Sequence, residues 1–597
     1  MRLPFQSRDT RYKRPFGAVA TGQTVEIDFP VPASLGADHV NLVVRGDFSL
    51  TVVLAYTRTD GDFAVFSGAF SLPKSGVYFY RFEIVMPDGI MHFVGKDEQG
   101  KAISGDWLPE WQLSVYDADY RTPDAFKGGV IYHVFVDRFH RIPDGRTPRF
   151  GYLKQWNEDV TIADADGIYR ANDFFGGNLQ GIRAKLDYFL SLGVTALYLS
   201  PVFEAASNHR YDTADYTRID PLLGTDEDFR ALTEEAKAKG ISVILDGVFN
   251  HTGADSIYFN KFGHYPSLGA YQSVDSPYYN WYSFSHFPDR YACWWGVTVV
   301  PSIRRDALSF QDMIAGEDGV IDRWCRLGAA GWRLDVVDEL SMPFVKRLRL
   351  AAKRNDALLI GEVWEDASTK YSYGERREYF YGKELDGVMN YPFRTAILHY
   401  VLEGDARMFA DEIMTIVENY PKPALDCSMT LIGTHDTVRI LNRLAPIETP
   451  ATKWERLHYR MPEDAYLESV ERVKLAATLQ FVLPGIPTIY YGDECGMEGF
   501  EDPINRRPYY VGSESLLAYY RRLGALRRQY RDDFCADTEV YADAGVAIIR
   551  RGKLTAFVNA GKSDYELDAP MRDLLGGKTV SVVEKGKAVL IRSGEER

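Results

Sequence analysis

The sequence predicts an α/β protein in which a (β/α)8, or TIM, barrel lies between an N-terminal β-sandwich and a C-terminal β-domain. The chain has 597 residues, which is too long for one hydrophobic core. Its first part alternates short apolar runs with turn residues, and its middle part repeats an apolar strand followed by an amphipathic helix. We place the domains at 1–120, 121–510 and 511–597, with a loop-rich insertion at about 250–305.

The N-terminal domain contains clear strand patterns. Apolar and β-branched residues fill 40–44, 51–56 and 77–85, and turn residues at Asp60-Gly61 and 87–89 separate them. This pattern is typical of an antiparallel β-sandwich. Sequence alone leaves three roles open for it, namely packing, glycan binding and dimerisation.

Eight strand candidates predict a closed barrel. They are 130–136, 194–199, 241–246 and runs beginning near 331, 357, 386, 428 and 486. The second follows a helix that has Ile182 and Phe189 on one face and Gly193 at its end, and the third follows a helix that begins near Thr225 and ends at Gly240. The gap between the third and fourth strands is too long for one helix, which predicts the insertion. Beyond 512, a helix and strands at 546–549 and 554–558 predict the all-β tail.

Composition narrows the classes of function. A formal charge of −15 argues against a nucleic-acid partner, and no apolar run reaches membrane-spanning length. The first eight residues are followed by no apolar segment, so we expect no signal peptide. Five scattered cysteines without C-x-x-C spacing predict reduced thiols in the cytoplasm rather than disulfides or a zinc site.

Four predicted strands end in carboxyl side chains. These are Asp246, Asp335, Glu362 and Asp436. Active sites of such barrels lie at the carboxyl ends of the strands. Because a charge at the end of an apolar strand is costly unless it is paired or used, this coincidence predicts an active site.

Spacing assigns chemistry to two of these residues. Adjacent strands lie about 4.8 Å apart, so Asp335 and Glu362 could have the roughly 5–5.5 Å separation of a retaining glycosidase. Strand periodicity places Arg333 on the face of Asp335, where it would keep that carboxylate ionised. An apolar frame of Ile360, Val363 and Trp364 would suit Glu362 as a protonated acid.

From about 110 to 510 the chain resembles the α-amylase family, and within it the neopullulanase, cyclomaltodextrinase and maltogenic amylase group. The matching motifs, in order, are Asp246-x-x-x-Asn250-His251, Gly331-x-Arg333-x-Asp335, Gly361-Glu362-Val363-Trp364 and His435-Asp436. Segments 174–179, 389–393 and 492–497 are also similar to this group. The resemblance implies that Asp335 is the nucleophile, that Glu362 is the general acid/base, and that Asp436 binds the 2- and 3-hydroxyls of the distorted sugar.

The resemblance also implies six substrate contacts. Arg333, His251 and His435 would bind the same sugar ring, with Tyr211 stacked beneath it, and Asp502 and Arg506 would hold the next sugar. Other residues keep two interpretations. Asp246 and Asn250 either brace the loop or bind substrate, and His209 is either a surface residue or a hydrogen-bond donor to the substrate. His133 has a single interpretation, a structural role. Trp294 and Trp295 are either core of the insertion or a sugar platform.

Departures from the group's pattern limit what the resemblance implies. Val337-Asp338-Glu339 is followed by Ser341-Met342, and Glu365 stands where the group often has His, so acceptor and linkage preferences stay open. The loop that usually binds calcium is 140–145 here, and Asn178 replaces an expected Asp. A hard cation prefers several carboxylate or carbonyl oxygens, so we expect no required cofactor, with calcium as an alternative.

The predicted function is a retaining hydrolase of α-1,4, and also α-1,6, glucosidic bonds in cyclodextrins, pullulan and short maltooligosaccharides, acting as a homodimer. A transglycosylase or an α-glucosidase on the same barrel is the alternative. A non-catalytic glycan-binding relative is disfavoured because all three acids are present. A metal-dependent barrel hydrolase is disfavoured because the strand ends lack His-x-His.

Overall fold

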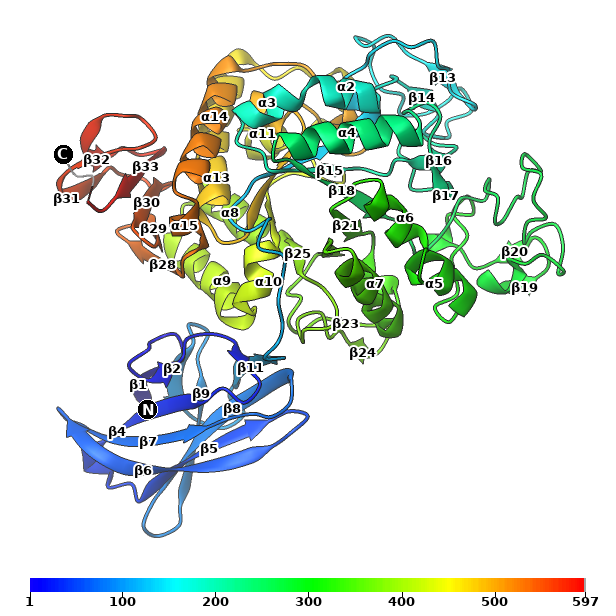
Figure 1. The fold of residues 1–597 in the computed structure, drawn as a ribbon. Helices are drawn as coiled ribbons and strands as arrows, with labels where there is room; N and C mark the ends of the chain where they lie inside the picture. The colour runs from blue at the N-terminus through cyan, green and yellow to red at the C-terminus, as the bar shows by residue number, and fades with distance from the viewer. Residues whose placement is uncertain (595–597) are drawn as a thin grey trace. The chain divides into compact units, whose positions relative to one another are not determined.

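The computed structural model describes residues 1–594, and Figure 1 shows its elements along the chain. It divides into two compact units, which we describe separately. The first comprises 1–122, 366–385 and 411–425, and the second comprises 123–365, 386–410 and the described residues from 426 onward.

An antiparallel sheet dominates the first unit, as predicted. Its main strands are β1 (Arg2–Gln6), β4 (Val25–Pro32), β5 (His39–Arg45), β6 (Leu50–Asp60), β7 (Phe63–Phe70), β8 (Gly76–Val85), β9 (Met91–Lys96), β10 (Lys101–Ser104) and β11 (Trp111–Tyr116). Aromatic side chains fill its core, where the rings of Phe29 and Phe82 stack with centroids 4.0 Å apart and Phe5 meets Phe82 edge-on at 4.8 Å. The three strand patterns predicted from sequence correspond to β5, β6 and β8.

Two segments distant in sequence complete the first unit. Arg8 pairs with Asp411 at 2.8 Å and with Glu418 at 3.0 Å, and the Tyr120 hydroxyl donates to the Leu385 carbonyl at 2.6 Å. Such side-chain contacts have no signature in local sequence. The N-terminal strands therefore have packing partners at 366–385 and 411–425.

The second unit contains the predicted closed parallel barrel. Its strands are β12 (Ile131–Val134), β15 (Ala196–Leu199), β18 (Ser242–Gly247), β21 (Gly331–Leu334), β22 (Leu358–Val363), β25 (Gly387–Asn390), β26 (Met429–Leu431) and β27 (Ile486–Tyr490). Every residue in these strands except Ser242 is buried, which explains why the strands appear in the sequence as nearly continuous apolar runs. All eight predicted strands are confirmed.

Helices connect the barrel strands. They are α2 (Leu179–Ala184), α3 (Leu186–Ser191), α4 (Asp226–Ala238), α5 (Leu308–Ala315), α6 (Val320–Arg326), α7 (Met342–Arg354), α8 (Tyr391–Glu403), α9 (Ala406–Asn419), α10 (Lys422–Cys427), α11 (Ile440–Leu444), α12 (Lys453–His458) and α13 (Glu463–Val482). Thr225 and Asp228 form a capping box that fixes the start of α4. The helix predicted near Ile182 is two short helices that meet at Lys185.

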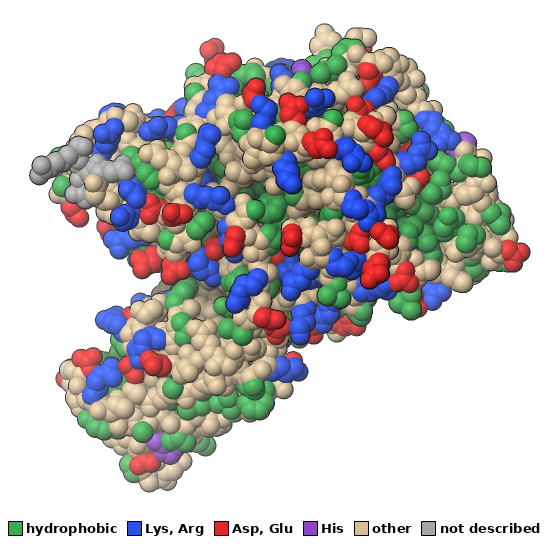
Figure 2. All heavy atoms as spheres, in the orientation of Figure 1, with side chains coloured by type: hydrophobic (Ala, Val, Ile, Leu, Met, Phe, Trp, Pro, Cys, Tyr) green, Lys and Arg blue, Asp and Glu red, His purple; other side chains and the backbone are tan. Residues whose placement is uncertain are grey.

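Between β18 and α5 the chain forms the predicted loop-rich insertion. Its short elements are η2 (Tyr279–Trp281), β19 (Phe284–His286), β20 (Arg290–Tyr291) and η3 (Trp294–Gly296). Phe259 anchors its core, with ring centroids 4.8 Å from Tyr282 and 4.7 Å from Tyr291. Figure 2 shows hydrophobic side chains gathered over the part of the chain that carries β19 and β20. Over the rest of the barrel face drawn there, acidic and basic side chains are interspersed.

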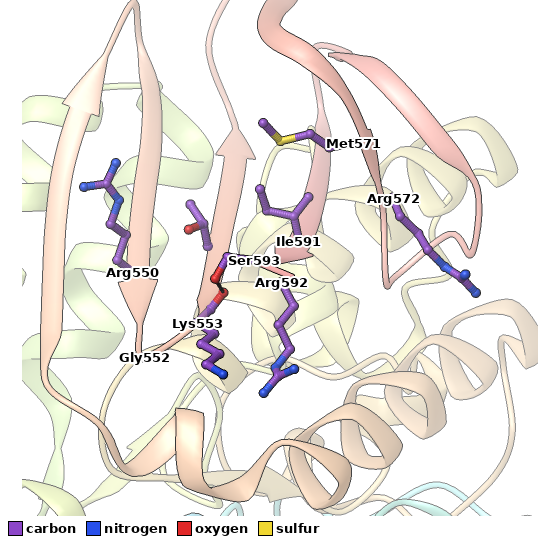
Figure 3. A pocket seen from close by; sticks show the side chains of 9 residues that line it. Arg550, Gly552, Lys553, Met571, Arg572, Ile591, Arg592 and Ser593 are labelled. Carbon is purple, nitrogen blue, oxygen red and sulfur yellow. Dashed lines mark hydrogen bonds between the residues drawn. The ribbon is translucent and has the colours of Figure 1, made fainter. Parts of the chain in front are cut away.

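The C-terminal part follows α14 (Glu514–Gln529) and α15 (Arg531–Cys535) and is all-β, as predicted. Its strands are β28 (Thr538–Asp543), β29 (Val546–Arg551), β30 (Leu554–Asn559), β31 (Tyr565–Arg572), β32 (Thr579–Val583) and β33 (Lys587–Arg592). Figure 3 shows a pocket in this domain. The pocket is lined by Arg550, Gly552, Lys553, Thr555, Met571, Arg572, Ile591, Arg592 and Ser593. Across residues 1–594, every helix is too short or too polar to cross a membrane.

Candidate active site

Four carboxyl side chains lie at the carboxyl ends of barrel strands. Asp246 and Glu362 are the second-last residues of β18 and β22. Asp335 directly follows β21, and Asp436 lies in the loop after β26. Because the strands are parallel, these side chains belong to one end of the barrel.

The guanidinium of Arg333 joins three of these carboxyl groups. Its Nη1 lies 2.9 Å from Oδ1 of Asp246 and 2.8 Å from Oδ1 of Asp335. Its Nη2 lies 2.8 Å from Oε2 of Glu362. Arg333 is 0% exposed, so solvent screens these ion pairs little. Asp335, which directly follows β21, and Glu362, on the adjacent strand β22, thus share one cation.

Burial makes full ionisation of this cluster costly. Burial is the largest cause of the raised pKa of Asp335, and the neighbouring charges of Glu362 and Asp246 raise it further. Burial likewise raises the pKa of Asp246. Arg333 acts in the opposite direction and lowers the pKa of Asp335, but its single guanidinium is divided among three buried carboxyl groups.

Glu362 has polar neighbours in addition to the apolar residues beside it in the sequence. The backbone N–H of Val336 donates to Oε2 at 2.8 Å, and the indole N–H of Trp364 donates to Oε1 at 3.2 Å. The Trp364 ring is 46% exposed and stacks on Tyr391 with centroids 3.9 Å apart. A residue that looks apolar in sequence therefore contributes a hydrogen-bond donor.

A second group of side chains surrounds Asp436. The Tyr211 and His435 rings stack within 10° of parallel, with centroids 5.3 Å apart, and Nε2 of His435 lies 3.2 Å from Oδ2 of Asp436. Arg506 contacts Asp436 at 3.3 Å and Asp502 at 2.9 Å. The structure thus gathers these five predicted residues.

Comparison with known proteins shows the family of this chain. A family model described as "Alpha amylase, catalytic domain" matches residues 133–298 and 311–533, which is more than half of the chain. The chain belongs to the α-amylase family. The resemblance predicted from the motifs is therefore confirmed.

Relatives within the family carry several names. The amylopullulanase of Thermoanaerobacterium saccharolyticum is 34% identical over 92% of this chain and 46% of its own length. The cyclomaltodextrinase of Geobacillus thermopakistaniensis is 34% identical over 69% of this chain and 64% of its own length. The chain therefore spans less than half of that amylopullulanase and just under two thirds of that cyclomaltodextrinase. Among solved structures, the ligand-free cyclic alpha-maltosyl-(1→6)-maltose hydrolase of Arthrobacter globiformis is 29% identical, with a TM-score of 0.64 over 79% of this chain and 99% of that one.

Burial lowers the pKa of the histidines of this α-amylase family site. Burial lowers the pKa of His251 to about 4 and that of His209 to about 3. Burial also lowers the pKa of His435 well below its ordinary value. His251 lies beside Trp294, with ring centroids 5.6 Å apart, and His133 contacts the Ser200 hydroxyl at 3.0 Å.

Sequence reasoning missed several residues that support the site. The Tyr198 hydroxyl donates to Asp246 at 2.6 Å, and Glu339 accepts from Asn250 at 3.1 Å. Tyr198 lies in β15, where it could have been identified as a polar tip within an apolar strand. Glu339 had no signal beyond its position, because its partners come from the insertion.

The side chains around the loop at 140–145 are hydrogen-bonded within the chain. Asp137 accepts hydrogen bonds from the backbone N–H groups of Phe175 and Gly176, both at 3.0 Å, and pairs with Arg138 at 2.7 Å. The side-chain oxygen of Asn178 accepts a hydrogen bond from the Gly181 N–H and so caps α2. The side-chain amide of Asn178 donates to the carbonyl of Ile142 at 2.7 Å. Within residues 1–594, no cluster of three or more His, Cys, Asp or Glu side chains is arranged to hold a metal.

Proposed function

We propose that this chain is a retaining hydrolase of α-1,4-glucosidic bonds, and of α-1,6 bonds, in cyclodextrins, pullulan and short maltooligosaccharides. The observation that carries the proposal is the guanidinium of Arg333, which lies 2.8 Å from both Asp335 and Glu362. Two carboxyl groups that share one guanidinium suit double displacement, in which one attacks the sugar and the other moves the proton.

In the first step, a carboxylate oxygen of Asp335 attacks the anomeric carbon. The bond to the leaving sugar breaks, and Glu362 donates its proton to the departing oxygen. In the second step, Glu362 takes a proton from water, the water oxygen attacks the anomeric carbon, and the bond to Asp335 breaks. Two inversions give net retention.

Residues around this pair position the substrate. Tyr211 would stack against the apolar face of the reacting sugar. Asp436 would accept hydrogen bonds from its hydroxyls, and Arg506 and Asp502, which are linked at 2.9 Å, would bind the next sugar. The mechanism requires that Glu362 carry a proton when Asp335 attacks.

The names of the relatives support the substrate class. Amylopullulanase and cyclomaltodextrinase relatives each share 34% identity with this chain. Neopullulanase 2 of Thermoactinomyces vulgaris shares 32% identity over 69% of it. We therefore include both linkages and cyclic substrates in the proposal.

Assembly and location belong to the same proposal. We propose a homodimer, because closed two-fold dimers are the commonest oligomers and the exposed Val53 and Tyr56 of β6 offer apolar surface. We propose the cytoplasm as its compartment. The odd, scattered cysteines support a reducing environment, and the relative from Bacillus subtilis that is 31% identical is named an intracellular maltogenic amylase.

Product analysis tests the function directly. Maltotriose, β-cyclodextrin, pullulan and starch are incubated in parallel with the full chain, and the products are separated by chromatography. We expect cleavage of cyclodextrin and maltotriose to be faster than cleavage of starch. Absence of cleavage on all four substrates by folded protein would contradict the proposal.

A further inference from the structure

The pocket in the C-terminal domain is lined by four cationic side chains. These are Arg550, Lys553, Arg572 and Arg592, and the pocket has a volume of about 240 Å³ (Figure 3). All of its lining residues belong to the all-β part that follows α15. The pocket is therefore a different site from the carboxyl cluster at the strand ends of the barrel.

Antiparallel register brings three of the lining residues into one row. Arg550 of β29 pairs with Thr555 of β30, and Thr555 pairs with Ile591 of β33. Directly opposite residues lie on the same face of a sheet, so these three side chains point to one side. The other residues of β29 are buried, so the row places a single exposed charge on this strand. Met571 and Arg572 of β31 also line the pocket.

The turn between β29 and β30 is fixed from two sides. The backbone N–H of Lys553 donates to Oδ1 of Asp533 at 2.9 Å, and the carbonyl of Lys553 accepts from the N–H of Ser593 at 2.9 Å. Gly552 has φ +54°, and a Cβ there would lie 2.6 Å from Oδ1 of Asp533, which favours glycine. Oδ2 of the same Asp533 pairs with Nε of Arg592 at 2.8 Å. One carboxylate thus holds both the turn and one cation of the pocket.

Positive charge at the pocket exceeds the carboxylate charge beside it. Arg592 has a close ion pair, whereas Arg550 lies 3.9 Å from Glu539, which is beyond hydrogen-bond distance. Among residues 1–594, no carboxylate lies within 4.0 Å of the side-chain nitrogens of Lys553 or Arg572. The chain as a whole carries a formal charge of −15, so this local excess of cations runs against its composition. Binding of an anion would relieve the repulsion between them.

Aromatic rings hold two of the guanidinium groups. Cζ of Arg550 lies 5.0 Å from the ring centre of Tyr541, and Cζ of Arg592 lies 5.0 Å from that of Tyr530. Such cation–π contacts restrict the long side chains before any ligand arrives. Less conformational entropy is then lost when an anion binds.

The rest of the lining suits a sugar. Met571 and Ile591 are half-buried and contribute apolar surface, while Thr555 and Ser593 contribute hydroxyl groups. Inorganic phosphate would use only the cations, whereas a sugar phosphate would also use the apolar surface and the hydroxyls. The volume of about 240 Å³ is smaller than the roughly 300–1,000 Å³ of pockets for drug-sized ligands, which favours one sugar ring over a nucleotide.

We propose that this pocket binds the phosphate monoester of a single sugar unit. Such a phosphate carries a charge of about −1.5 to −2 near pH 7, and Arg and Lys are the side chains that bind phosphate oxygens most strongly. The sugar unit is either a free hexose phosphate or a phosphorylated glucose residue of a glucan, because both present the same groups. The inference goes beyond the proposed hydrolase, since binding here uses none of the barrel's carboxyl groups.

Calorimetric titration of the full chain with glucose 6-phosphate tests the proposal. The wild-type chain should bind it with a millimolar or lower Kd, bind inorganic phosphate at least about threefold more weakly, and show no heat of binding with glucose. Lys553→Met and Arg572→Met each remove one charged donor. Each should weaken the binding of glucose 6-phosphate about tenfold.

Two further variants sharpen the test. Lys562→Met makes the same change of charge at an exposed residue outside the pocket, so it is the matched control and should leave binding unchanged. Met571→Ser should weaken glucose 6-phosphate about threefold and leave inorganic phosphate unchanged, because it removes only apolar surface. Thermal melting checks the folding of each variant, and if Lys553→Met does not fold, Arg572→Met decides on the same criteria.

Two maltodextrins distinguish the sources of the phosphate. They are titrated into Glu362→Gln, which should not cleave them, and only one of them carries 6-phosphate groups. Tighter binding of the phosphorylated maltodextrin, with the difference abolished by Arg572→Met, would identify a phosphorylated glucan as the ligand. Equal binding of both would identify the free hexose phosphate.

Three outcomes would overturn the inference. One is a folded wild-type chain that does not bind glucose 6-phosphate at millimolar concentration. Another is an unchanged affinity in both Lys553→Met and Arg572→Met. The third is inorganic phosphate that binds as tightly as glucose 6-phosphate, which would show a site for anions only. Cleavage of maltotriose by the same wild-type preparation tests the proposed hydrolase separately, so either proposal can fail without the other.

Discussion

Arg333 serves three carboxyl groups at once, and this sharing determines how protons are held in the site. Its guanidinium lies within 2.9 Å of Asp246, Asp335 and Glu362. A single positive charge cannot neutralise three negative charges in a buried cluster, so at least one carboxyl group retains a proton. A retaining glycosidase needs this combination, with one ionised nucleophile and one protonated acid.

Removal of either reacting carboxyl group should abolish catalysis. For Asp335→Asn or Glu362→Gln we expect kcat/KM on maltotriose to fall at least about a thousandfold, because each acts in the transition state. Circular dichroism should show an intact fold. A folded Asp335→Asn protein with more than about a tenth of the wild-type rate would contradict the assignment.

The pH profile should respond to Asp246. Its negative charge raises the pKa of Asp335. Asp246→Asn removes that charge and should therefore lower the pKa of Asp335, so that the nucleophile stays ionised at lower pH. We expect the acidic limb of kcat/KM to move to lower pH, while neutral His435 adds no limb near pH 6. An acidic limb that stays in place or moves upward would count against this coupling.

The sequence indicated the reacting residues but not their surroundings. Asp335 and Glu362 could be predicted because strand ends and motifs are local in sequence. The bond between Trp295 and Glu339 spans 44 positions and depends on how the insertion folds. Likewise, Trp364 appears in the sequence as an apolar neighbour of Glu362. Only the orientation of its ring in the structure shows that its indole N–H donates to Glu362.

Among the elements, the barrel strands were predictable and the loops were not. A strand such as β22 is buried along its whole length, so its apolar run is visible in the sequence. The loop from 140 to 178 contains only the two-residue strands β13 (Tyr152–Leu153) and β14 (Asp173–Phe174), and buried polar contacts such as that of the Phe175 N–H with the Asp137 carboxylate hold it. Such contacts leave no periodic pattern.

The same loop predicts independence from calcium. Asp137 and Asn178 already bond to the chain's own groups, so a cation would have to displace them. We expect EDTA to change kcat on maltotriose by less than about twofold, with any effect of calcium confined to the melting temperature. A complete loss of activity that added calcium reverses would show that this loop has been misinterpreted.

At the scale of the whole molecule, the N-terminal strands are not a detachable module. Arg8 pairs with Asp411 and Glu418, so deletion of 1–120 would remove ion-pair partners from 411–425. The sequence could predict the β-rich N-terminal domain from its strand periodicity. It could not predict the packing of these strands against 411–425, because long-range contacts leave no local pattern.

Assembly should therefore be tested on the full chain. We expect light scattering to give a dimer that dissociates on dilution, because two-fold association is a concentration-dependent equilibrium. The ratio of β-cyclodextrin to starch cleavage should fall as the dimer dissociates. A chain that is monomeric at every concentration and cleaves starch faster than cyclodextrin would refute both the dimer and the preference.

The central claim is that Asp335 forms a covalent bond to the sugar, and trapping that intermediate tests it most directly. In Glu362→Gln, 5-fluoro-α-D-glucosyl fluoride needs no acid to release fluoride, and the base that would hydrolyse the intermediate is missing. Digestion and mass spectrometry should find the fluoroglucosyl group on the peptide that contains Asp335. A label on another residue, or fluoride release without any labelled peptide, would contradict the account.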